Sequence, residues 1–178
     1  MPTQAHPLES FFQHEVASIF EGRLGMNDPE ITNYVARVLY SFSQEGSQFL
    51  STNPTGHTVE ELLTMIRASD PVFGSAPSFD AERAMRKYVG DYALFVAGML
   101  PEALGVEGKA PASRPSLGEL IRAGRESYQI VASFNVFEYK REAPMFARLA
   151  DQFERYVLGL ALVREQLGRR LGISAQMA

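Results

Sequence analysis

The segment YVGDYALFVAGML, residues 88–100, contains one charged residue, Asp91. Two further stretches, residues 127–137 and 156–163, contain no charged residue. A helix that is apolar on more than one side is normally buried on more than one side. These stretches therefore predict three long central helices, covering about 80–100, 116–142 and 144–171.

Around this centre, apolar residues recur at helical spacing in three shorter segments: about 8–24, 29–49 and 58–69. Asp28 before Pro29 is typical of a helix start, because the aspartate side chain can accept hydrogen bonds from free backbone amides and proline has no amide to satisfy. Ser116 and Glu119 have the spacing of a capping box. Since no segment shows sustained strand alternation, we predict an all-α fold.

The length of 178 residues is enough for one domain with its own core. We expect residues 1–178 to form a single-domain bundle of about six helices. Residues 105–115 are rich in glycine and proline and predict a loop, and residues 1–7 predict a flexible tail.

The composition excludes several classes of function. There are 17 lysines and arginines against 21 aspartates and glutamates, which gives a net charge of −4 and little support for nucleic-acid binding. The absence of cysteine removes thiolate nucleophiles and cysteine metal sites. No signal-peptide pattern or apolar run of about 18 residues is present, so we expect a cytoplasmic protein with no membrane partner.

Glu15 lies in the apolar sector of the first predicted helix, beside Phe11 and Ile19. A buried carboxylate must pair with a cation or hydrogen-bond donors, or its pKa must rise. Glu15 is therefore a candidate catalytic acid or base, or a metal ligand. The alternative is a structural carboxylate that reaches the edge of the bundle or pairs with an arginine.

A second polar group interrupts the apolar face predicted for residues 116–142. Asn135 lies in the middle of that face with Tyr128, and Glu138 and Glu142 continue the stripe. One interpretation is a pocket in which Asn135 and Glu138 are catalytic candidates and Tyr128 and Glu142 bind a ligand. The other is a satisfied core amide at a place where the helix leaves the core.

Asp91 has Lys87 one helical turn before it, and an ion pair between them explains both residues without a function. The three histidines show no ligand spacing, and the sequence contains no phosphate-binding glycine loop or serine nucleophile motif. We therefore predict no metal site and no cofactor.

Small residues line the reverse side of the helix at 80–100, at Gly90, Ala93 and Ala97. Another helix of the same chain or a second copy of the chain must approach them closely. Leu158 and Leu162 form an additional apolar pair on the last helix. This surplus of apolar faces predicts a homodimer.

The function most consistent with these patterns is a non-enzymatic interaction, scaffold or oligomerisation module. The alternative is a small-molecule-binding protein or an enzyme whose pocket between helices uses Glu15, Tyr128, Asn135 and Glu138. Convergence of these side chains on one cavity would favour the second reading.

Overall fold

The computed structural model describes residues 6–52, with the backbone alone from residue 45, and residues 78–105 and 115–172. Its elements are α1 (Pro7–Phe20), α2 (Pro29–Thr52), α4 (Phe79–Met99), the 3₁₀ helix η1 (Pro101–Ala103), α5 (Leu117–Ser133), the 3₁₀ helix η2 (Phe137–Arg141), α6 (Ala143–Asp151) and α7 (Phe153–Arg170). The described residues thus form six α-helices and no strand, which confirms the all-α bundle.

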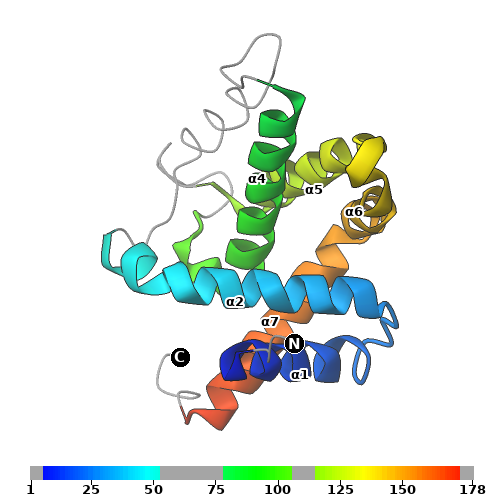
Figure 1. Cartoon of the computed structure of the whole chain (residues 1–178). Helices are drawn as coiled ribbons and strands as arrows, with labels where there is room; N and C mark the ends of the chain where they lie inside the picture. The colour runs from blue at the N-terminus through cyan, green and yellow to red at the C-terminus, as the bar shows by residue number, and fades with distance from the viewer. Residues whose placement is uncertain (1–5, 53–77, 106–114, 173–178) are drawn as a thin grey trace.

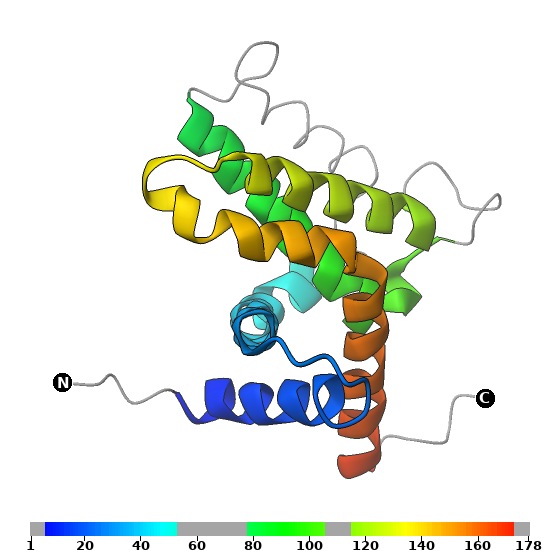
Figure 2. The same cartoon turned by 90° about the vertical axis from the view of Figure 1, so that its right-hand side faces the viewer.

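The helices pack in two tiers. In Figure 1, α2 crosses the middle of the molecule, with α4, α5 and α6 on one side of it and α1 on the other. Figure 2 shows α7 running along one flank, from the end of α6 to α1. This path lets α7 contact both α4 and α1, so the last helix connects the two tiers.

The predicted start signals are present. The backbone amide of Ile31 donates to Asp28 Oδ1 at 3.2 Å. Ser116 and Glu119 form the reciprocal capping box, with bonds of 3.2 and 2.9 Å. The hydrogen bond from Ser116 is also the main reason why the pKa of Glu119 lies below its usual value.

Several predictions lie partly outside the described residues. They are the helix at 58–69, residues 1–5 of the tail and residues 106–114 of the loop. The tail was predicted to reach residue 7, but α1 already begins at Pro7, and the side chain of His6 accepts a hydrogen bond from Leu8.

The predicted helix at 116–142 is shorter than expected, because α5 ends at Ser133. The Ser133 hydroxyl donates to the carbonyl of Ile130 at 2.6 Å, a local bond that competes with helix continuation. The chain then turns, and Phe137 adopts a positive φ of 48°. The helix predicted at 144–171 is likewise divided at Gln152, so α6 packs on α5 while α7 turns toward α1.

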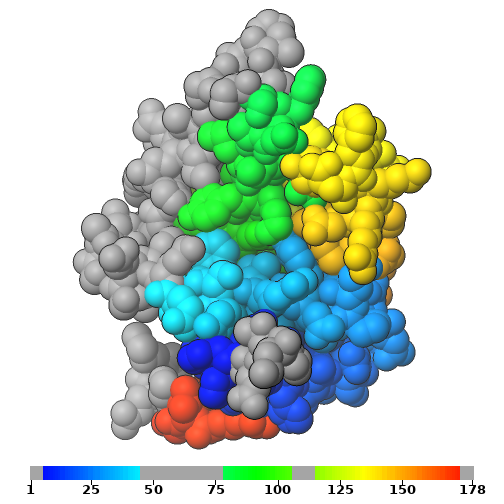
Figure 3. Space-filling view, in the orientation of Figure 1, coloured from blue at the N-terminus to red at the C-terminus, as the bar shows by residue number. Residues whose placement is uncertain are grey.

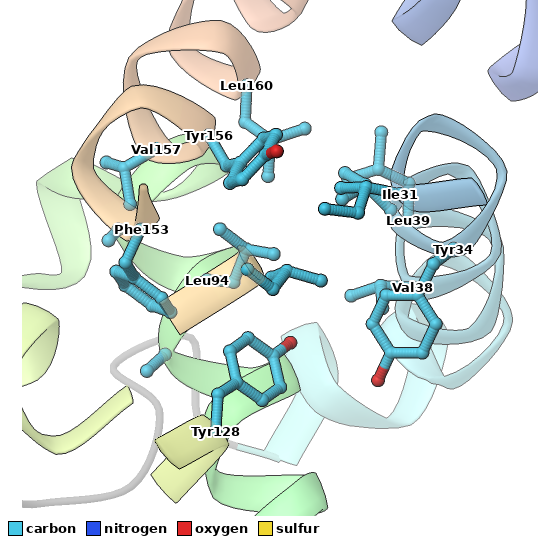
Figure 4. Close-up of a cluster of buried hydrophobic side chains, with 14 of the residues drawn as sticks. Ile31, Tyr34, Val38, Leu39, Leu94, Tyr128, Phe153, Tyr156, Val157 and Leu160 are labelled. Atoms are coloured by element: carbon cyan, nitrogen blue, oxygen red, sulfur yellow. The ribbon is translucent and has the colours of Figure 1, made fainter. Parts of the chain in front are cut away.

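Side chains from α1, α2, α4, α5, α6 and α7 share one apolar core. Figure 4 shows part of it, with Tyr34 of α2 and Tyr128 of α5 beside each other and Leu94 of α4 close to the Tyr128 ring. The two tyrosine rings meet edge to face, with centroids 6.5 Å apart. The core is therefore built around polar-tipped rings whose hydroxyls need partners.

The small residues of α4 are covered by the chain's own helices. Gly90 lies against the ring of Tyr128, and Gly98 lies against Leu160 of α7, so close that an added Cβ would overlap either neighbour. This strip is therefore an internal contact and leaves no surface for a second copy. Leu158 remains 53% exposed and Leu162 is half-buried, and the homodimer through this pair stays a prediction.

Replacing Gly98 by alanine tests the close approach of α4 and α7. Helix propensity alone would make Gly98→Ala stabilising by about 1 kcal/mol. Overlap with Leu160 Cβ should reverse the sign and destabilise the fold by about 1–3 kcal/mol. Denaturant unfolding measures this change, and a variant more stable than the parent would contradict the packing described here.

Candidate functional site

The carboxylate of Asp91 is the centre of a buried polar cluster. Its Oδ1 accepts hydrogen bonds from the hydroxyls of Tyr34 and Tyr128, the latter at 2.7 Å. Its Oδ2 accepts from Lys87 Nζ at 2.7 Å. The cluster joins α2, α4 and α5, and Asp91 is only 8% exposed. The predicted Lys87–Asp91 pair is present, but it is one part of a buried network rather than a surface pair.

Burial is the largest cause that raises the pKa of Tyr34 and of Tyr128 well above the usual value, and the negative charge of Asp91 adds to it. Both hydroxyls therefore remain protonated donors at neutral pH. Because both oxygens of Asp91 are already engaged, this carboxylate is suited to holding three helices together rather than to taking a proton from a substrate.

A polar pocket of about 460 Å³ opens above this cluster, where α2, α4 and the junction of η2 and α6 meet. Figure 3 faces the surface where these segments meet. Asp91, Lys87 and Tyr34 contribute to its lining, together with Arg37 and Arg141. We call this space the polar pocket.

Arg83 connects the polar pocket to the next surface feature. It is 7% exposed, and its Nη2 donates to Glu142 Oε2 at 2.7 Å. Its guanidinium carbon lies 4.0 Å from the centroid of the Tyr139 ring, within cation–π range. Tyr139 in turn donates to Asp80 at 3.0 Å. This chain of contacts attaches η2 to α4.

An open groove of about 770 Å³ lies on the other side of η2. It is lined by the start of α4, the end of α5 and η2, and we call it the aromatic groove. Phe79, Val136 and Phe137 are 68%, 53% and 88% exposed around it. The rings of Phe79 and Phe134 meet edge to face at 6.5 Å. Several large apolar side chains are thus exposed close together around this groove.

Glu15 is fully buried, as its position on the first helix predicts. It accepts from Arg170 Nη1 and from Gln166 Nε2, each at 2.6 Å. Both partners lie on α7, so the pair joins the first and last helices. This geometry matches the structural alternative, an ion pair with an arginine, rather than a catalytic acid.

The other candidates do not gather with Glu15. Asn135 follows the end of α5 and is exposed, because the helix that would have carried it inward has ended. Glu138 is exposed in η2 and lines the aromatic groove, whereas Glu142 lines the polar pocket. Tyr128 is buried at Asp91. The predicted pocket with Glu15, Tyr128, Asn135 and Glu138 is therefore not formed.

Sequence reasoning missed Tyr34, Arg37 and Arg141 in the polar pocket and Phe137 in the groove. Tyr34 fits a helical apolar face and gives no signal of its polar partner. Residues 127–137 are uncharged. If the sequence had shown that α5 ends at Ser133, the apolar residues after that end would have been predicted to be exposed.

The chain matches no protein-family model, no curated protein and no solved structure. Across the described ranges, no helix combines the length and apolar character that a membrane crossing requires. The same residues contain no group of three or more histidine or carboxylate side chains arranged to hold a metal ion.

Alkaline titration tests the buried tyrosines. An unfolded tyrosine ionises near pH 10, whereas folded Tyr34 and Tyr128 stay protonated there. Above about pH 10 the folded state therefore binds more protons than the unfolded state. The contribution of these tyrosines to the free energy of unfolding is fully present below about pH 10, and above it falls by about 1.4 kcal/mol per pH unit for each tyrosine. Tyr34→Phe should reduce the slope of unfolding free energy against pH by one proton. Ionisation of all seven tyrosines before unfolding, seen by tyrosinate absorbance, would contradict this.

Substitution of Glu15 tests the pair between α1 and α7. Glu15→Gln leaves Arg170 without its charged partner and should destabilise the fold by about 1–3 kcal/mol near neutral pH. Glu21→Gln, at an exposed position just beyond α1, is the matched control and should change stability by no more than about 0.5 kcal/mol. Equal melting curves for both variants would count against the structural role of Glu15.

Proposed function

We propose that this chain is a non-enzymatic interaction domain that binds a short segment of a partner protein in the aromatic groove. The segment carries apolar side chains flanked by lysine or arginine. The sequence also favours an interaction module, and this proposal adds that the aromatic groove is its binding surface.

The exposure and backbone conformation of Phe137 carry the proposal. Its ring is 88% exposed, and its φ of 48° is unusual for a bulky residue. Strained backbone and exposed aromatic rings are both costly, and they are retained where a ligand or partner uses them. Phe79 and Val136 extend the same apolar surface, which gives a partner side chain an area to cover.

The charges around the groove indicate the chemistry of the partner. The carboxylates of Asp80 and Glu138 contribute to its lining, and the described residues that line it include no lysine or arginine. A carboxylate rim around an apolar floor favours basic side chains beside an apolar anchor. The occupant is therefore expected to be a basic, apolar peptide rather than an acidic one.

Peptide display tests this function. Twelve-residue random peptides selected on the immobilised full chain should be enriched in an aromatic or aliphatic residue next to lysine or arginine. Phe137→Asn removes the ring but tolerates positive φ, so it should keep the melting temperature while weakening the selected peptides at least about tenfold. Glu138→Lys should also weaken binding of the selected peptides, and this loss of affinity should grow as the salt concentration is lowered.

Leu171→Asn is the matched control, since Leu171 is a 71% exposed apolar residue just beyond the end of α7, outside the groove lining. It should leave peptide affinity unchanged. Selected peptides that bind Phe137→Asn as well as the parent would refute the groove as the site. A parent dimer that becomes monomeric in Phe137→Asn would also overturn the proposal, because the groove would then hold a second copy of the chain.

A further inference from the structure

The charges of the polar pocket point to a second ligand, independent of the aromatic groove. We propose that the polar pocket binds a small organic anion, with its negative group between Arg37 and Arg141 and its apolar body deeper in the pocket. The ligand class is a phosphate monoester or a carboxylate on a small hydrophobic group.

The carboxylates of the pocket already have cationic partners. Asp91 is paired with Lys87, and Glu142 with Arg83, each at 2.7 Å. Glu30 is paired with Arg148 at 2.8 Å. The charges of Asp91 and Glu142 are therefore compensated, and the charge of Glu30 is reduced by an arginine that it shares with Asp28.

The two remaining arginines are not compensated. Arg37 and Arg141 are exposed at the pocket, and neither forms an ion pair or a side-chain hydrogen bond within the part of the chain that the structure describes. Arg148 also holds Asp28, so the pocket and its immediate partners contain five cations and four carboxylates. The net excess is one positive charge, and the cations that have no carboxylate partner among the described residues are Arg37 and Arg141. Guanidinium groups bind carboxylate and phosphate oxygens through paired hydrogen bonds, which favours an anion there.

The rest of the pocket suits an apolar body. Val38, Phe42 and Met145 contribute apolar surface to the lining. A volume of about 460 Å³ lies in the range of small-molecule pockets. The ligand is thus expected to be amphiphilic, with a compact hydrophobic group attached to its charged end.

The floor of the pocket is held rigidly. Lys87 Nζ lies 5.0 Å from the centroid of the Tyr34 ring, and both side chains bond to the buried Asp91. A ligand therefore meets side chains that are already ordered, which lowers the entropic cost of binding.

Titration of the full chain with three probes of similar size tests this site. The probes are phenyl phosphate, phenylacetate and benzylamine, followed by amide NMR shifts and by melting temperature. The anions should bind saturably, shift amides of residues 34–42 and 141–145, and raise the melting temperature, whereas benzylamine should not. The tighter of the two anions assigns the charged group as phosphate or carboxylate.

Arginine variants locate the anion. Arg37→Gln combined with Arg141→Gln should raise the Kd of the better anion at least about tenfold. Arg122→Gln, at an exposed position on α5, is the matched control and should leave the Kd unchanged. Phe137→Asn should also leave it unchanged, so failure here is distinguishable from failure of the peptide-binding groove.

Three results would overturn the proposal. The first is no saturable binding of either anion. The second is benzylamine binding as tightly as the anions. The third is an unchanged Kd in the double arginine variant, with circular dichroism showing that the variant is folded.

Discussion

The buried carboxylate of Asp91 is the interaction on which the rest of the structure depends. An isolated carboxylate in the core would cost several kcal/mol, so its charge requires Lys87 and the two tyrosine hydroxyls to reach it together. These donors come from α2, α4 and α5, and satisfying one group therefore fixes the mutual positions of three helices. The position of α5 in turn determines where its last residues, and then η2, leave the core.

The segment η2 contributes to both surface sites. Phe137, Glu138 and Tyr139 line the aromatic groove, while Arg141 lines the polar pocket. Arg83 contacts both the Tyr139 ring and the carboxylate of Glu142. A peptide that displaced Tyr139 would therefore also disturb the Arg83–Glu142 pair. The two proposed sites differ in the ligand that we expect each to bind, but η2 contributes residues to both.

The elements could be predicted where the cause is local. Asp28 with Pro29, and Ser116 with Glu119, act within one turn of backbone, and both signals are used as expected. The burial of Glu15 followed from helical periodicity alone. The end of α5 at Ser133 was missed because residues 127–137 are uniformly uncharged, and an uncharged run does not distinguish a buried helix from an exposed connection. Lys87, one turn away, was predicted as a partner of Asp91, but Tyr34 and Tyr128 were missed because they lie 57 and 37 residues away in sequence, a separation that periodicity does not address.

The same limit explains why the pocket predicted from the sequence differs from the two surface sites in the structure. A polar residue in an apolar helix face is the usual sequence signal of a site, and Glu15 and Asp91 both give that signal. In the structure, however, both carboxylates are paired with cations and serve to hold helices together. The complementary signal is an apolar residue in a polar setting, and it becomes visible only after the ends of the helices are known. Phe137 occupies such a position: its ring has no place in the core because the chain has already turned away from it. In a helical bundle that satisfies its buried charges internally, binding sites are therefore better sought among exposed apolar side chains and uncompensated surface charges than among buried polar ones.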